Sequence, residues 1–290
     1  MSAARVAIVQ FPGVNCEVET ARALARAGLE PELVRWTRPA RDLAAFDAYV
    51  LPGGFSWQDR VRAGALAAKD PMLDELAARA AAGAPELGIC NGAQVLVESG
   101  LVPGNGDDVT SGQAPGAGRE DGDQVRVALA RNRMPERTGY YTRWVWCRIE
   151  DSPCVFTRAL EPGTLLPLPV AHGEGRFASA KKGRVAALAE SGQAPLRYAH
   201  ADGALAEAFP ENPNGSDAAV AALCNARGNV LALMPHPERA ATLGQVSRAI
   251  GGGWGERRDR ALAAGDGSAF GDGPGMAIFH GLARFFEAQP

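Results

Sequence analysis

Pro85-Glu86-Leu87-Gly88-Ile89-Cys90-Asn91-Gly92-Ala93-Gln94-Val95-Leu96 is the stretch that decides the fold. A short apolar run leads into Cys90, a helix-forming run leads out of it, and a glycine stands two positions to either side. This pattern is typical of a nucleophile elbow, a strained strand-to-helix turn that lifts one side chain above a sheet. The glycines avoid collision with the neighbouring strand or helix, and the helix N-terminus favours a thiolate. The alternative is a buried structural cysteine before a helix.

The first hundred residues alternate predicted strands and helices around this elbow. Strands are predicted over Val6–Gln10, Glu32–Trp36, Ala48–Leu51 and Leu87–Cys90, and helices over Cys16–Ala27, Pro71–Ala82 and Asn91–Ser99. In the first helix Val18, Ala21, Leu24 and Ala25 recur at helical spacing. The alternation predicts an α/β fold with a mostly parallel sheet flanked by helices. Such sheets place their sites at the carboxyl ends of the strands, where Cys90 and the turn 52–55 both lie.

The rest of the chain predicts an added, more irregular β region and two glycine-rich inserts within one domain, residues 1–290. Strands are predicted over Gln124–Arg131, Thr142–Glu150 and Leu165–Ala171, and a hairpin over Ala218–Cys224 and Asn229–Met234. The inserts are 104–122 and 251–275, and we interpret both as surface loops. For the second, a solvated loop is favoured over a functional basic site at Arg257–Arg260. An amphipathic helix is predicted over Met276–Ala288.

Composition limits the classes of protein that this chain could be. It has 290 residues, 46% of them hydrophobic, with a net charge of −3, so no bulk attraction to nucleic acid or to an anionic membrane is expected. The five cysteines include no Cys-x-x-Cys pair, which argues against a zinc ribbon or a thioredoxin-type site. The size of the chain argues against a disulfide scaffold. The N-terminus shows no basic-then-apolar leader and the chain has no bilayer-spanning apolar run. We therefore expect a cytoplasmic protein that binds no metal.

A thiolate nucleophile needs a base, usually a histidine held by a carboxylate. Of four histidines, His236 follows the predicted strand 230–234, lies between two prolines and precedes Glu238 by two residues. In extended backbone, positions i and i+2 face the same side, so the carboxylate would reach the imidazole. A proline-flanked turn with a chance His and Glu is the alternative. Taken alone, the remaining histidines are more often structural than catalytic: His172, His200 and His280.

Acyl transfer also needs donors for an oxyanion. The backbone N–H of Asn91, directly after the nucleophile, is one candidate. The second should come from the loop after a neighbouring strand, where glycine allows a close approach of the main chain. We predict Gly54 for this role; the alternative is that Pro52-Gly53-Gly54 is only a turn.

These residues resemble the class I glutamine amidotransferases, and among them the PurQ-type glutaminase subunits of phosphoribosylformylglycinamidine synthase. The similarity covers most of the chain, and its matching stretches are Phe11-Pro12-Gly13-Val14-Asn15-Cys16, Leu51-Pro52-Gly53-Gly54-Phe55-Ser56, Gly88-Ile89-Cys90-Asn91-Gly92-Ala93-Gln94, Val170-Ala171-His172-Gly173-Glu174-Gly175, Asn212-Pro213-Asn214-Gly215-Ser216 and Met234-Pro235-His236-Pro237-Glu238-Arg239. The resemblance implies a flavodoxin-like fold. The elbow and His-Pro-Glu are general to class I, whereas Ala-His-Gly-Glu-Gly carries most of the pathway specificity.

The resemblance implies a role for each matching residue. Cys90 would attack the side-chain amide of glutamine and form a glutamyl thioester. His236 would protonate departing ammonia and then activate water, with Glu238 orienting it. The N–H groups of Asn91 and Gly54 would stabilise the oxyanion.

Further residues and partners follow from the same resemblance. Gln94 is similar to a residue that contacts bound glutamine, and His172 and Glu174 would lie near the pocket or a partner surface without a chemical step. Ammonia would pass to an ATP- and Mg-dependent synthetase, PurL, with the small PurS subunit as a further partner. The chain itself would bind no cofactor, because it has no Gly-x-x-x-x-Gly-Lys-Ser/Thr loop. The product would be formylglycinamidine ribonucleotide, in purine biosynthesis.

This chain departs from the family pattern in its two inserts, and stretches such as 131–144 and 150–153 resemble the glutaminase domain of the single-chain synthetase. The departures leave the partner arrangement open. Rival interpretations are an amidotransferase subunit for pyridoxal phosphate or cytidine nucleotide synthesis, a DJ-1-type cysteine hydrolase or chaperone, and an inactive binding subunit. The late His-x-Glu argues against the DJ-1 type.

Overall fold

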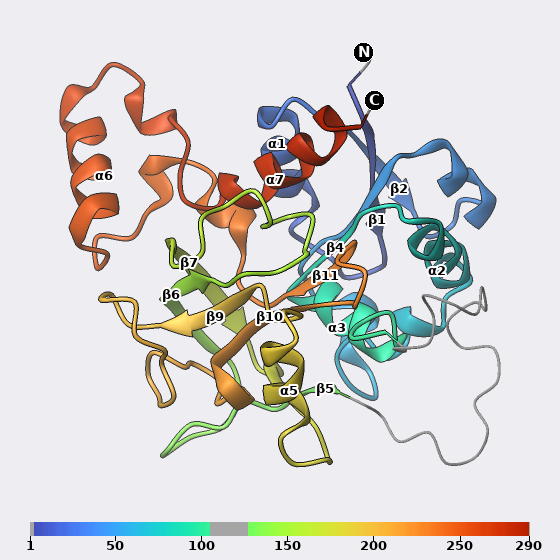
Figure 1. Ribbon diagram of the computed structural model, residues 1–290. Coiled ribbons are helices and arrows are strands. Elements are labelled where there is room, and N and C mark those ends of the chain that lie inside the picture. Colours follow the sequence, from blue (N-terminus) through green and yellow to red (C-terminus); the bar gives the residue numbers. More distant parts are fainter. Residues whose placement is uncertain (1–2, 105–126, 290) are drawn as a thin grey trace.

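A computed structural model describes residues 3–104 and 127–289, which form an α/β fold around one large sheet (Figure 1). The sheet has nine strands in the order β2-β1-β3-β4-β11-β10-β9-β6-β7. In that order they are Glu30–Arg35, Arg5–Gln10, Ala48–Leu51, Glu86–Ile89, Val230–Leu233, Val220–Cys224, Leu196–Ala199, Tyr141–Ile149 and Leu165–His172. The first five pair in parallel, and every pairing from β11 to β7 is antiparallel. The predicted fold class is confirmed.

Helices cover both faces of the parallel half of the sheet. They are α1 (Glu17–Arg26), α2 (Met72–Ala82), α3 (Asn91–Glu98) and α7 (Met276–Glu287). Helices α1 and α7 lie together on one face, and α2 and α3 on the other (Figure 1), as right-handed crossovers in opposite directions require. The strands between them are buried on both faces, so β1 carries the unbroken apolar run Val6–Val9, which is fully buried.

The predicted elements of the first hundred residues all form, with small shifts at their ends. Strand β2 begins two residues before the predicted start, and α1 is a helix of ten residues. The predicted apolar stripe of α1 is wrong in part, because Val18 is 49% exposed. The buried face is instead Thr20, Ala23 and Leu24. Thr20 can be buried because its hydroxyl donates a hydrogen bond to the Cys16 carbonyl at 2.7 Å.

The predicted irregular β region is largely an ordered extension of the main sheet. Strands β6 and β7 pair over eight positions, and β9 joins β6 to the hairpin of β10 and β11. Only β5 (Ala128–Ala130) and β8 (Arg176–Ala178) form a separate two-stranded sheet. A short helix, α5 (Arg184–Glu190), lies between β8 and β9. Sequence reasoning missed α5, β8 and β9.

The interpretation of the second glycine-rich insert as a solvated loop is wrong. The segment folds as helix α6 (Gly252–Ala264), which projects from the body of the protein (Figure 1). Glycines end the helix at both sides, with Gly265 left-handed at φ 64°. Arg258 is buried and donates to the carbonyl of Ile250 at 3.1 Å, so it anchors α6 rather than forming a basic patch. The first insert, 104–122, lies outside the described residues beyond Gly104, as does the start of the strand predicted over Gln124–Arg131. One domain over 1–290 therefore stays a prediction.

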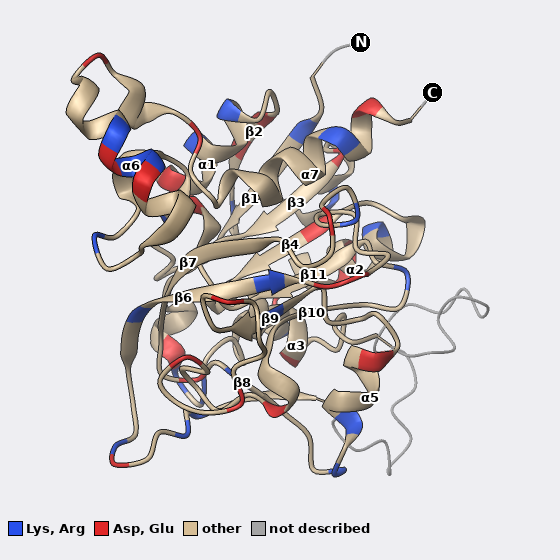
Figure 2. Ribbon diagram, turned by 60° about the vertical axis from the view of Figure 1, so that its left-hand side comes forward, with Lys and Arg blue, Asp and Glu red and all other residues tan. Residues whose placement is uncertain are grey.

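Charged side chains of both signs are mixed over the surface, and Figure 2 shows them interspersed along α6. Over residues 3–104 and 127–289, no helix combines the length and apolar character needed to cross a membrane.

Candidate active site

Cys90 lies on a strained turn between β4 and α3, as predicted. Its backbone has φ 50° and ψ −101°, a conformation that costs a non-glycine residue energy and is characteristic of functional positions. A Cβ on Gly88 would lie 2.5 Å from the Gly92 carbonyl oxygen, and one on Gly92 would lie 1.9 Å from the Leu51 carbonyl oxygen. Both glycines are therefore required by the close packing of strand and helix around the turn.

His236 and Glu238 follow the next strand of the sheet. Strands β4 and β11 are parallel neighbours with Ile89 opposite Leu233, so the residues that follow them meet at one edge. His236 Nδ1 lies 2.6 Å from Glu238 Oε1, and both side chains are buried. The predicted extended backbone is wrong, however. Pro237–Ala240 forms a 3₁₀ turn that begins after His236. This turn of the backbone brings the Glu238 carboxylate to the imidazole.

The electrostatics of His236 favour its charged form. Burial lowers the pKa of His236, but the Glu238 carboxylate and the neighbouring Cys90 and Cys16 thiols outweigh this and raise it well above its usual value. With Nδ1 on Glu238, Nε2 has no other hydrogen-bond partner among the described residues. The thiol of Cys90 is also 3.6 Å from the Ala171 carbonyl oxygen. The arrangement can therefore hold a cysteine nucleophile against a protonated histidine.

The two predicted oxyanion donors lie beside this thiol. Asn91 is the first residue of α3, and Gly54 follows β3 with φ 146°. A Cβ on Gly54 would lie 2.5 Å from Val14 Cα, so only glycine allows this approach. Within the described part of the chain neither backbone N–H donates to a protein acceptor, and both stay available for an anion. The Asn91 side chain is structural, since its Oδ1 accepts from the Ser56 N–H at 2.9 Å.

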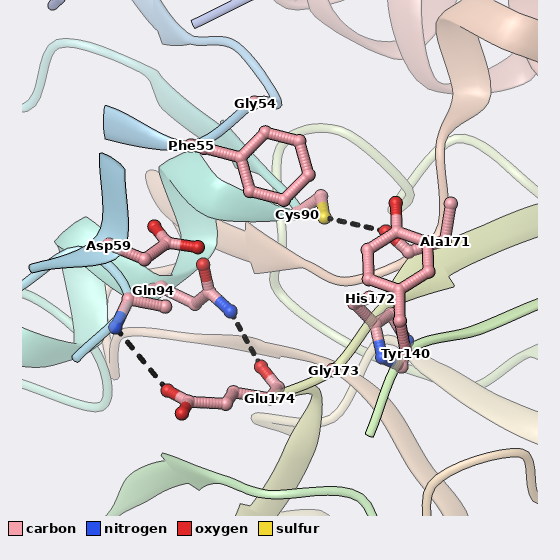
Figure 3. A pocket seen from close by; sticks show the side chains of 11 residues that line it. Gly54, Phe55, Asp59, Cys90, Gln94, Tyr140, Ala171, His172, Gly173 and Glu174 are labelled. Carbon is pink, nitrogen blue, oxygen red and sulfur yellow. Dashed lines mark hydrogen bonds between the residues drawn. The ribbon is translucent and has the colours of Figure 1, made fainter. Parts of the chain in front are cut away.

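A cavity of about 180 Å³ opens beside the thiol (Figure 3). It is lined by Gly54, Phe55, Asp59, Ala63, Cys90, Gln94, Tyr140, Ala171, His172, Gly173 and Glu174. In Figure 3, Asp59, Gln94 and Glu174 gather on one side, and Cys90 lies toward Ala171 on the other. The cavity thus presents a nucleophile at one end and two carboxylates at the other.

Gln94 lines this cavity. Its Nε2 donates to the Glu174 carbonyl at 2.6 Å, and its Oε1 accepts from Asn91 Nδ2 at 2.9 Å. These bonds fix the amide at the cavity wall. Glu174, for which sequence reasoning assigned no step, contributes both this carbonyl and a carboxylate.

Asp59 also lines the cavity, and sequence reasoning did not single it out. It ends a run of three residues with positive φ, Trp57 to Asp59, which stores strain in a non-glycine backbone. Burial and the neighbouring Glu174 raise the pKa of Asp59 to about 6, despite a hydrogen bond from Asn91. Two carboxylates so placed favour a cationic group in the cavity. A lone Asp in a loop gives no periodic signal from which this could be predicted.

His172 also faces the cavity, which places the resembling Ala-His-Gly-Glu-Gly segment at the site. Burial and the charge of His236 lower the pKa of His172 to about 3, so it is neutral. Its Nδ1 lies 3.2 Å from Asn132 Oδ1, and a Cβ on Gly175 would lie 2.2 Å from the ring. His280 and His200 lie elsewhere: His280 pairs with Asp272 at 2.9 Å, and His200 is exposed in a turn.

Comparison with known proteins agrees with this geometry. Residues 3–286 match the family described as CobB/CobQ-like glutamine amidotransferase domain. The chain is 40% identical to phosphoribosylformylglycinamidine synthase subunit PurQ of Methanothrix thermoacetophila, over 98% of this chain and 99% of that protein. It is 44% identical to the subunit of the same name from Thermomicrobium roseum, over 81% and 87%. A solved structure described as PurLQS from Thermotoga maritima contains a chain with a TM-score of 0.63 and 31% identity, covering 91% of this chain and 99% of that one.

Proposed function

The chain belongs to the CobB/CobQ-like glutamine amidotransferase family, and we propose that it is the glutaminase subunit of a phosphoribosylformylglycinamidine synthase. The observation that carries this proposal is that an elbow cysteine and a histidine held at 2.6 Å by a glutamate follow two neighbouring parallel strands and interact electrostatically. The relatives' names favour purine synthesis over the pyridoxal phosphate and cytidine pathways.

The site residues divide the chemistry into two steps. The Cys90 sulfur attacks the side-chain amide carbon of glutamine, and the N–H groups of Asn91 and Gly54 stabilise the resulting oxyanion. Protonated His236, oriented by Glu238, gives its proton to the leaving nitrogen, so that ammonia departs and a thioester remains. Neutral His236 then takes a proton from water as the water attacks the thioester, and glutamate leaves with the Cys90 thiolate and protonated His236 restored.

The charge of the cavity supports an amino acid as substrate. With the amide at Cys90, the α-ammonium group would extend toward Asp59 and Glu174, which lie across the cavity from the thiol. Gln94, bonded to the Glu174 carbonyl, lies on the same side of the cavity as these two carboxylates. This places a positive group where two carboxylates otherwise repel each other.

The ammonia produced would pass to the synthetase PurL, with PurS as a further subunit. The relatives' names and the solved structure described as PurLQS support this partnership. A partner surface beside the site is also consistent with Phe55 and Tyr140, whose rings lie 6.2 Å apart and are 43% and 54% exposed, since exposed aromatics are enriched at interfaces. We propose that ATP and magnesium are used by that partner and that this chain binds no cofactor. All five cysteines are free thiols, which supports a cytoplasmic setting.

Reconstitution with a purified synthetase partner tests the proposal. The complex should convert glutamine to glutamate and form product from formylglycinamide ribonucleotide and ATP. The Cys90→Ala complex should lose glutamine use and retain activity with ammonium chloride. Absence of glutamate formation by the wild-type complex, or glutamine use by the variant, would contradict it.

A further inference from the structure

A second cysteine lies against His236, and the proposed mechanism does not use it. Cys16 precedes α1 and is fully buried. Its Sγ, a nitrogen of His236 and a carboxylate oxygen of Glu238 all lie within 4.8 Å of one another. A second sulfur therefore lies near the imidazole, in addition to that of Cys90.

Backbone packing holds this sulfur in place. The N–H groups of Asn15 and Cys16 both donate to the Gly53 carbonyl, at 3.1 and 3.2 Å. A Cβ on Gly53 would lie 3.0 Å from Cys16 Sγ and 2.8 Å from His236 Cε1. The missing side chain at Gly53 thus leaves room for the sulfur and the imidazole to lie next to each other.

Arg239 lies next to both the Cys16 sulfur and the Glu238 carboxylate. Its Nη2 lies 3.0 Å from Cys16 Sγ, and its Nε lies 3.6 Å from Glu19 and 3.9 Å from Glu238. The guanidinium therefore touches both the sulfur and the carboxylate that contact the imidazole. Since Cys16 has no exposed surface, it is badly placed to act as a nucleophile toward a substrate.

We propose that Cys16 and Arg239 form a positioning pair that fixes His236 and Glu238 in the orientation needed for proton transfer to and from Cys90. The inference rests on the proposed function. Cys16 is a positioning residue: its sulfur packs beside the imidazole and accepts a hydrogen bond from Arg239, whose guanidinium also lies 3.9 Å from the Glu238 carboxylate. Catalysis depends steeply on such alignment, because a displacement of ~1 Å can cost about a hundredfold in rate.

The test compares Cys16→Ala, Cys16→Ser and Cys147→Ala in the complex with the synthetase. Cys147 is also fully buried, in β6, and serves as the matched control. Cys16→Ala should lower kcat for glutamine roughly tenfold with KM and ammonia-dependent activity unchanged, because the cavity and the partner are untouched. Cys16→Ser should restore most of kcat, since a hydroxyl can replace the hydrogen bonds. Cys147→Ala should resemble the wild type.

A wild-type value of kcat in Cys16→Ala, or an equal loss in the serine variant, would overturn the inference and leave the proposed function intact. Failure of the wild-type complex to use glutamine would instead refute the proposed function. If Cys16→Ala does not fold, Arg239→Met decides, because that side chain is 39% exposed and its removal takes away the donor to the sulfur. Its kcat should fall at constant KM, and an unchanged kcat would overturn the inference.

Discussion

Gly53→Ala should impair catalysis while leaving the fold intact. The added Cβ would lie 2.8 Å from His236 Cε1, so the ring must move by about 0.6 Å to restore an ordinary contact. Gly53 does not have a positive φ, so alanine brings no backbone strain there. Because a misplacement of ~1 Å can cost about a hundredfold, we expect kcat for glutamine to fall between about tenfold and a hundredfold.

The assay is glutamate formation by the complex with the synthetase, with ammonia-dependent synthesis measured alongside. Gly253→Ala is the matched control, because nothing lies within 4 Å of the Cβ it would add in α6. KM for glutamine and the melting temperature should stay close to the wild-type values in both variants. A kcat within twofold of the wild type for Gly53→Ala would refute the reasoning that the glycine makes room for the imidazole.

Two further predictions concern buried carboxyl groups. Glu86 is fully buried, neither oxygen has a partner in the described residues, and burial raises its pKa well above the usual value. The unfolded chain therefore releases this proton at a lower pH than the folded chain does. As a result, the free energy of unfolding is highest at low pH and falls as the pH rises, by about 1.4 kcal/mol per pH unit. Glu86→Gln should lack this fall. In urea unfolding at pH 5.5, 6.5 and 7.5, the free energy of unfolding of the variant relative to the wild type should therefore increase with pH. An equal dependence on pH in the two proteins would contradict this. Asp59, whose pKa is raised to about 6, should be ionised above that pH, so wild-type KM for glutamine should rise below it. Asp59→Asn should raise KM about tenfold, because the α-ammonium group would no longer meet a negative charge there, and should abolish that pH dependence. A KM equal to the wild type at pH 8 would argue against a cation at this position.

Much of the parallel half of the fold could be predicted from sequence, for a physical reason. Its strands are buried on both faces and its helices end at glycines, as at Gly28 and Gly83, so composition follows structure closely. For α6 the same reasoning predicted a loop, because the segment is rich in glycine and poor in apolar residues. The helix is instead anchored by the guanidinium of Arg258. Strands of the antiparallel half such as β9 were missed because they are short and are stabilised by strands far away in the sequence.

The candidate triad of Cys90, His236 and Glu238 could be proposed from sequence because a glycine-flanked cysteine and a proline-flanked histidine are local signals. The route by which Glu238 reaches His236 could not, since nothing local in the sequence distinguishes the predicted extended backbone from the 3₁₀ turn Pro237–Ala240 that forms. Asp59 could not be predicted either, because its place in the cavity depends on three left-handed residues that are not glycine. The contact between Cys16 and His236 joins residues over two hundred positions apart and has no periodic signature.

The most direct test is to label the protein, in complex with the synthetase, with a glutamine analogue that carries an electrophile in place of the side-chain amide, and to map the modified peptide by mass spectrometry. One equivalent should attach to Cys90, with the other four cysteines unmodified, and excess glutamine should prevent the reaction. In His236→Ala the rate of labelling should fall sharply. Attachment at another cysteine, or labelling that glutamine does not slow, would contradict the assignment of Cys90 as the residue that attacks glutamine.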